Sequence, residues 1–129
     1  MKFEHSFVVQ STDIDQQWHV NNVRYVQWIQ DVAVAHWLSK ATDEQKVNIA
    51  WVVARHEIDY LRAAFVKETI IVQTWVGIPN GAKWERFTEI KRSDVVLVKA
   101  KSVWVGLDSK RLRPIRINAE MHKTFGVFE

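Results

Sequence analysis

The sequence predicts an α+β fold in which a curled antiparallel sheet surrounds one long helix. Residues 22–38 carry apolar side chains at helical spacing. Most of the chain after residue 47 is instead rich in β-branched and aromatic residues, interrupted by short turn sequences. Short turns join antiparallel neighbours. A single apolar helix and a single sheet bury each other best when the sheet curls around the helix.

Size and composition indicate one globular domain spanning residues 1–129. Hydrophobic residues make up 47% of the chain and charged residues 26%, which is close to the globular average. The absence of cysteine excludes disulfides, thiolate metal sites and cysteine nucleophiles, and fits a reducing compartment. Residues 3–9 alternate in polarity and lack the apolar stretch of a signal peptide or membrane span. We therefore expect a cytoplasmic protein without membrane contact.

The N-terminal third is predicted to form a strand, a polar connection and the long helix. Residues 3–11 read as a strand, and a polar stretch follows over residues 12–19. In the helix, from residue 22 to about 38, one apolar stripe comprises Tyr25, Trp28, Ile29, Val32 and His36, and a second comprises Val23, Val26, Ala33 and Trp37. A helix that is apolar around most of its girth must be wrapped by other structure. Asn21 or Asn22 is a natural cap for its first turn.

The remaining elements follow from turn sequences and β-rich runs. Residues 43–46 suggest a short helix, and strands are predicted over residues 47–61, 69–77, 82–92 and 95–107, with a further strand around 114–117 and a helical tail from Asn118. The strongest turn sequence is Pro79-Asn80-Gly81. The far face of the sheet is expected to stay partly apolar through Ile71, Trp75 and Trp104, and pairing of subunits would cover it.

The densest cluster of chemically capable side chains lies in residues 13–22, directly before the helix. The first N–H groups of a helix lack internal partners and carry partial positive charge, so they can stabilise a carbonyl oxygen that becomes negative during acyl transfer. A nearby carboxylate could then attack the acyl carbon or draw a proton from water. Asp15 is the candidate. From residue types alone, Asp13, Asp15 and the two asparagines equally suit turns and caps.

The other polar residues indicate no second chemistry. His36 lies on the apolar stripe and is expected to be a core residue, while His5, His56 and His122 lack metal-ligand spacing. No metal and no redox cofactor are therefore expected. The net charge is +3, but the basic residues are scattered or in short groups. A nucleic-acid partner is not expected, because Trp28 and Trp37 lie on the predicted helix and Trp51, Trp75 and Trp104 lie within predicted strands.

The same cluster resembles a known family. Asp-Ile-Asp at 13–15 followed by His-Val-Asn-Asn-Val-Arg-Tyr-Val-Gln-Trp at 19–28 is similar to the signature of the hotdog-fold acyl thioesterases, both the 4-hydroxybenzoyl-CoA thioesterase-like group and the acyl-ACP thioesterases. Residues 57–62, 99–105 and 113–115 resemble later strands of that family. The resemblance implies a hotdog fold, with an antiparallel sheet of five to six strands wrapped around one central helix.

The resemblance also implies roles for individual residues. Asp15 would be the catalytic carboxylate, as nucleophile or general base, and the backbone N–H of Asn22 would polarise the thioester carbonyl. His19, with Asn21 or Asn22, would orient the loop or the attacking water. Tyr25 would line the acyl pocket or pack beneath it. Trp18 stands where many relatives carry glycine, so its bulk is expected either to narrow the acyl site or to redirect the loop.

The implied activity is hydrolysis of an acyl-CoA or acyl-ACP thioester by a homodimer or homotetramer. In this family the site usually lies at a dimer interface, and Arg62, Lys91 and Arg92 are weak candidates for contacts with CoA phosphates. Dehydration of a hydroxyacyl thioester is an alternative, because it also needs an acid or base beside a polarised carbonyl. A non-catalytic acyl-thioester-binding protein is the other alternative.

Overall fold

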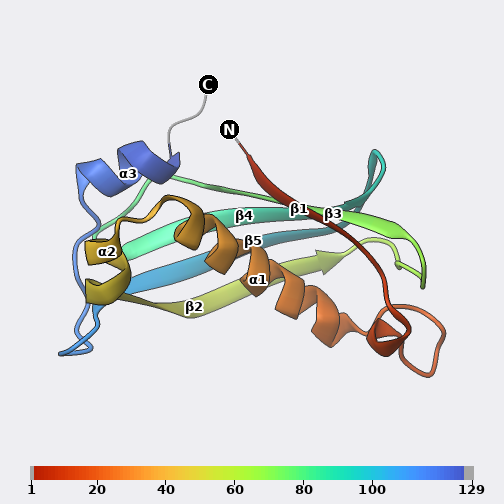
Figure 1. Ribbon diagram of the computed structural model, residues 1–129. Coiled ribbons are helices and arrows are strands. Elements are labelled where there is room, and N and C mark those ends of the chain that lie inside the picture. Colours follow the sequence, from red (N-terminus) through yellow and green to blue (C-terminus); the bar gives the residue numbers. More distant parts are fainter. Residues whose placement is uncertain (1, 127–129) are drawn as a thin grey trace.

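The computed structural model describes residues 2–126 and contains one five-stranded antiparallel sheet crossed by a long helix (Figure 1). In the sheet the strands lie in the order β1-β3-β4-β5-β2. Their bounds are β1 Phe3–Val8, β2 Ile49–Tyr60, β3 Thr69–Val76, β4 Lys83–Arg92 and β5 Val95–Asp108. The helices are α1 Asn22–Lys40, α2 Asp43–Asn48 and α3 Ala119–Gly126, and a 3₁₀ turn spans Ser11–Asp13. The predicted α+β architecture, with one helix against one sheet, is confirmed.

The main core forms where α1 lies on the inner face of the sheet. Along β3 every second residue is buried, as expected for a strand with one covered face. These inner side chains meet the buried stripe of α1, and the cluster includes Tyr25, Trp28, Ile29, Val32, Ile70, Val72, Ile90 and Leu97. None of the helices in the described part of the chain is long and apolar enough to cross a bilayer.

The helix is less enclosed than its apolar residues predicted. The stripe containing Tyr25, Ile29 and His36 is buried, in agreement with the prediction. The second stripe is only partly covered: Ala33 is buried, whereas Val23 is 70% exposed. In the single chain the sheet covers one side of α1, and part of the second stripe stays open.

Local signals placed most turns correctly but misjudged two features. The turn between β3 and β4 is closed by paired hydrogen bonds between Asn80 and Lys83, at 2.8 and 3.0 Å. The two central residues of the turn are therefore Gly81 and Ala82 rather than an Asn-Gly pair. Gly81 takes the positive φ in this turn. The predicted strand at 114–117 is absent: Pro114 makes one isolated bridge with Leu107, and proline has no N–H to extend a ladder.

Trp104 faces the helix and not the far side of the sheet, which corrects the prediction. Residues of a strand alternate between faces, and Trp104 shares its face with Ala100 and Ser102, which are buried against α1. Trp75 does lie on the outer face, where its ring stacks on Phe87 with centroids 6.0 Å apart. The outer apolar surface is therefore smaller than expected, and the inner face gains a tryptophan.

Candidate active site

A short closed loop connects the 3₁₀ turn to α1 and holds the predicted catalytic residues. Ile14 and Val20 pair as an antiparallel bridge, and the Asp15 N–H donates to the His19 carbonyl at 3.0 Å. The Trp18 N–H donates back to the Asp15 carbonyl at 3.2 Å. These bonds fold residues 14–20 into a compact hairpin-like loop that ends at the first turn of the helix.

Asp13 anchors this loop. Its side chain is buried and accepts hydrogen bonds from the Gln10 N–H and from Arg24 Nε, each at 2.8 Å. Its backbone carbonyl accepts from the Asn21 N–H at 2.9 Å. With both carboxylate oxygens engaged by the protein, Asp13 has a structural role, and the loop's other acid is left for chemistry.

Asp15 is partly exposed and lines an open depression. Its Oδ1 accepts from the Gln17 N–H at 2.8 Å, which fixes the side-chain direction, and its Oδ2 lies 3.9 Å from His19 Nδ1. The depression has a volume of about 650 Å³ and is bordered by Ile14, Asp15, Gln16, Gln17 and Asn21. The carboxylate therefore faces a space that a substrate can enter.

The start of α1 contributes a free hydrogen-bond donor. Asn21 is the N-cap, and its side-chain oxygen accepts from the Val23 N–H at 2.9 Å, while its carbonyl accepts from the Arg24 N–H. Within residues 2–126 the Asn22 N–H has no hydrogen-bond partner. A free N–H at the positive end of a 19-residue helix is suited to binding a negatively charged or polarised oxygen.

The six predicted site residues do not all border the depression. Asp15 and Asn21 line it, and His19 and Asn22 belong to the same loop and helix start. Tyr25 does not border the depression: it is buried, and its hydroxyl accepts from the Ala64 N–H at 2.9 Å. Burial raises the pKa of Tyr25, against the lowering effect of that backbone bond, so the phenol stays neutral.

Trp18 adopts the conformation of a glycine without filling the site. Its φ of 71° lies in the left-handed region, which is unfavourable for a bulky side chain. The side chain is 81% exposed and does not border the depression. The loop thus keeps a glycine-type backbone at this position, and in the single chain the ring does not narrow the site.

Three residues of the depression were not predicted, namely Ile14 and two glutamines. Gln16 and Gln17 border it, and the backbone of Gln17 holds the Asp15 carboxylate. Their position directly after Asp15 in a polar loop was the available signal, since an Asp side chain often accepts from the N–H two residues later. Of the residues proposed for CoA phosphates, Arg92 is engaged by Glu68 at 2.9 Å and Lys91 lies 3.6 Å from Glu89.

No cluster of metal-binding side chains is present in the described part of the chain. Groups of three or more His, Asp or Glu side chains close enough to hold an ion do not occur between residues 2 and 126. The chemical groups gathered at the loop are the carboxylate of Asp15, the imidazole of His19 and the backbone donors at the start of α1.

Comparisons with known proteins agree with the fold. A probable thioesterase from Escherichia coli is 22% identical, with 95% of each chain covered and a TM-score of 0.81. A 1,4-dihydroxy-2-naphthoyl-CoA thioesterase from Synechocystis is 14% identical, covers 96% of this chain and 95% of its own, and has a TM-score of 0.82. A mutant 4-hydroxybenzoyl CoA thioesterase complexed with 4-hydroxybenzoyl CoA is 13% identical, with coverage of 97% and 99% and a TM-score of 0.86.

The family follows from the sequence match. No curated protein sequence matches the chain. The model of the acyl-ACP thioesterase N-terminal domain, however, matches residues 1–125. This match covers nearly the whole chain and includes the loop with Asp15 and all of α1. The chain therefore belongs to the acyl-ACP thioesterase family, and the predicted hotdog fold and thioester hydrolase class are confirmed.

Proposed function

We propose that the protein hydrolyses an acyl-CoA or acyl-ACP thioester at the junction between the Asp15 loop and α1. One observation carries this proposal: a carboxylate facing open space and an unpaired helix N–H, at Asn22, lie at the same junction. Similar proteins include the two CoA thioesterases described above and a 12:0-ACP thioesterase from Umbellularia californica, which supports the same substrate class here.

The Asn22 N–H and the Asp15 carboxylate would each carry out one part of the reaction. The Asn22 N–H and the positive end of α1 stabilise the negative charge that forms on the thioester oxygen, a contribution of about 3 kcal/mol for one such donor. Asp15 either draws a proton from a water that attacks the carbonyl carbon, or attacks that carbon itself before water releases the acid. In both routes the carbon–sulfur bond breaks, the thiol leaves with a proton, and water supplies the acid's second oxygen.

His19 and Asn21 would hold this arrangement together. The His19 Nδ1 lies 3.3 Å from the Val20 carbonyl and 3.9 Å from Asp15 Oδ2, so the ring bridges the end of the loop and the carboxylate. Asn21 caps the helix and borders the depression, which orients the neighbouring Asn22 N–H. Trp18, being exposed at the tip of the loop, would contact the substrate's carrier or a second subunit.

Assembly into a homodimer or homotetramer is part of the proposal. The open side of α1 exposes Val23, Val34 and Leu38, with exposed fractions of 70%, 48% and 52%. The strand β2 lies at the edge of the sheet, so the backbone groups along its outer side are not used by a neighbouring strand of this chain. A second subunit would cover both surfaces. A cytoplasmic location, expected from the sequence, also remains part of the proposal.

The experiment is a thiol-release assay on purified protein with acyl-CoA esters from short to long and with aromatic esters. Asp15→Asn should lower kcat by about 10²- to 10⁴-fold, the range typical of a lost general base, while leaving the circular dichroism spectrum unchanged. The matched control is Asp94→Asn, the same change in the exposed turn between β4 and β5, which should keep full activity. Undiminished hydrolysis by Asp15→Asn would refute the assignment.

A further inference from the structure

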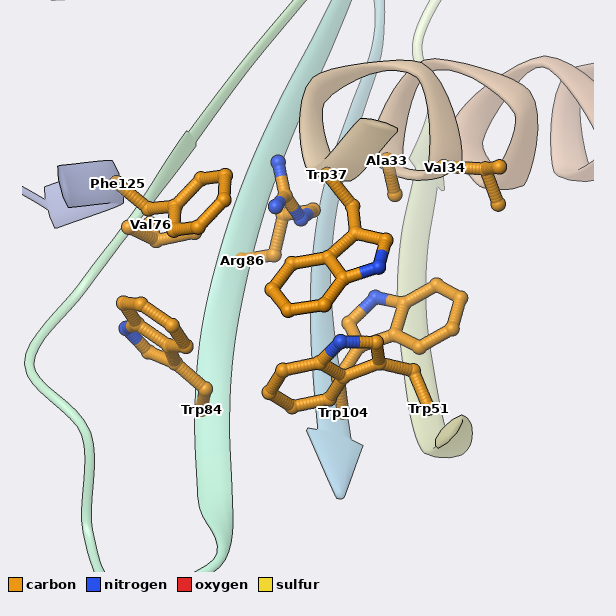
Figure 2. Close-up of a pocket in the computed structure, with 9 residues that line it drawn as sticks. All are labelled: Ala33, Val34, Trp37, Trp51, Val76, Trp84, Arg86, Trp104 and Phe125. Atoms are coloured by element: carbon orange, nitrogen blue, oxygen red, sulfur yellow. The ribbon is translucent and has the colours of Figure 1, made fainter. Parts of the chain in front are cut away.

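The C-terminal half of α1 borders a second, aromatic cavity. Its volume is about 60 Å³, which is room for a few water-sized groups. Four of the chain's seven tryptophans line it, namely Trp37, Trp51, Trp84 and Trp104. Figure 2 shows Trp37, Trp51 and Trp104 on one side of the Arg86 side chain, and Trp84 on the other side with Phe125 of α3. Val34, which is 48% exposed, marks where the cavity reaches the surface.

A buried cation without a counter-ion lines this cavity. Arg86 is 8% exposed, and its Nη1 donates to His36 Nδ1 at 3.0 Å and to Thr74 Oγ1 at 3.1 Å. Both partners are uncharged, because burial, with the nearby charges of Arg86 and Lys40, lowers the pKa of His36 to about 3. Burial lowers the pKa of Arg86 only to about 10, so the guanidinium stays charged at neutral pH. Among residues 2–126 no carboxylate forms a salt bridge with it.

The cavity wall offers further hydrogen-bond donors and almost no acceptors. In the part of the chain that the structure describes, Arg86 uses only Nη1, which leaves the Nε and Nη2 donors without protein partners. The indole N–H groups of Trp51 and Trp104 are also buried without partners. Buried donors are nearly always satisfied in folded proteins, so the two unpaired indole N–H groups beside a charged guanidinium indicate a missing acceptor. The remaining lining side chains are apolar or aromatic.

We propose that this cavity binds a carboxylate carried on a short apolar stem. The free Nε and Nη2 edge of Arg86 is a planar fork that matches the two oxygens of a carboxylate, and the indole N–H groups of Trp51 and Trp104 complete its hydrogen bonds. The aromatic walls enclose the part of the stem next to the carboxylate, and the rest of the stem leaves through the opening at Val34. A carboxylate in this place neutralises a buried charge that is otherwise strongly unfavourable.

The site is distinct from the Asp15 depression within one chain. Between them α1 contributes Tyr25, Trp28, Ile29 and Val32 to the packed core. At 1.5 Å per residue, the 11 residues from Asn22 to Ala33 separate the two ends by roughly 16 Å. The proposal therefore does not rest on the thioesterase mechanism, and a binding measurement tests it without any activity.

The first test is calorimetric titration of the purified protein with hexanoate and, in parallel, with hexan-1-ol. The alcohol has the same stem but no charge. Hexanoate should bind about tenfold more tightly or better, since hydrogen bonds to a charged group are the stronger ones. Equal affinity for the alcohol, or no binding of hexanoate, would overturn the proposal.

The second test removes single donors while keeping an aromatic ring at each position. Trp51→Phe and Trp104→Phe should each weaken hexanoate binding by about three- to tenfold, the effect of one lost hydrogen bond. The matched control is Trp75→Phe, which alters a tryptophan on the outer face of the sheet. Arg86→Gln should abolish binding, and if this variant does not fold, the two indole variants still decide the question. Equal affinities in all three phenylalanine variants would contradict the assigned donors.

A third arm distinguishes two sources of the carboxylate. It can be a free acid or, in the proposed dimer, the far end of a dicarboxylic acyl group whose thioester lies at the Asp15 loop of the second subunit, a source that rests on the proposed function. Competitive inhibition of thioester hydrolysis by hexanoate identifies the acyl group, and binding without competition identifies a separate acid. Both results uphold an anion site at Arg86, whose existence the titration alone decides.

Discussion

The two ends of α1 use hydrogen-bond donors in opposite surroundings. At the N-terminal end, the Asp15 carboxylate borders an open depression, and the Asn22 N–H, free within residues 2–126, lies at the adjoining start of α1. At the C-terminal half, Arg86 and two indole N–H groups are enclosed by aromatic rings. An open polar site lets water reach the reacting carbon, whereas a dry site makes each unpaired donor costly until a ligand satisfies it. The difference suggests catalysis at one end and retention of a ligand at the other.

The enclosed end should make stability depend on pH. His36 has a pKa near 3 in the native state but about 6.5 when unfolded, so the unfolded state binds more protons between these values. Stability should be highest above pH 6.5 and fall as the pH decreases towards 3, by about 1.4 kcal/mol per pH unit for this group. Burial also lowers the pKa of His56, which adds to the slope in the same direction.

Urea unfolding at pH 7, 6 and 5 measures this dependence, and His36→Gln isolates the contribution of His36. Glutamine can still accept from Arg86 but does not titrate. The variant should show a shallower slope than the original protein. Identical slopes would mean that His36 ionises in the native state as it does in water, and the contrast between the dry and the open end would fail.

The two acids of the N-terminal loop should differ in their effect on stability. Asp13→Ala removes two hydrogen bonds to a buried carboxylate, one of them from Arg24, and should cost about 2–3 kcal/mol. Asp15→Ala removes only the bond from the Gln17 N–H in an exposed loop and should cost about 0.5 kcal/mol. Chemical denaturation of both variants provides the comparison. A larger loss of stability for Asp15→Ala would show that Asp15, and not Asp13, anchors the loop.

The smallest effect is expected at Trp18. The φ of Trp18 is 71°, so Trp18→Gly relieves left-handed strain, although glycine also raises the entropy of the unfolded chain. The net effect should be a stabilisation of about 0.5–1 kcal/mol. Trp18→Ala removes the ring but keeps the strain, so it should not share this gain. Thermal unfolding midpoints test the order. If alanine proved as stabilising as glycine, the exposed ring and not the backbone would be the source of the strain.

Local patterns were sufficient for most of the architecture. The apolar stripe with Tyr25, Ile29 and His36 identified the buried face of α1. Residue type predicted a cap at Asn21 or Asn22, and the structure has Asn21 as the N-cap. Such features depend on neighbours a few positions away in sequence, so periodicity and turn chemistry reveal them. The prediction of a strand at 114–117 was wrong because it relied on composition. Pro114 has no N–H to donate to a β-ladder, and it forms only an isolated bridge.

The amino-acid sequence by itself determined the elements of this protein, the order in which they occur and the loop that carries Asp15. Only the tertiary structure decided that Asp13 anchors while Asp15 stays open, and that Trp51, Arg86 and Trp104 surround one cavity. These residues lie on β2, β4 and β5, far apart along the chain, and strand pairing alone brings them together. Sequence spacing indicates which side chains share a face of one helix or strand. Burial, and the choice of hydrogen-bond partners, depend instead on contacts between different helices and strands.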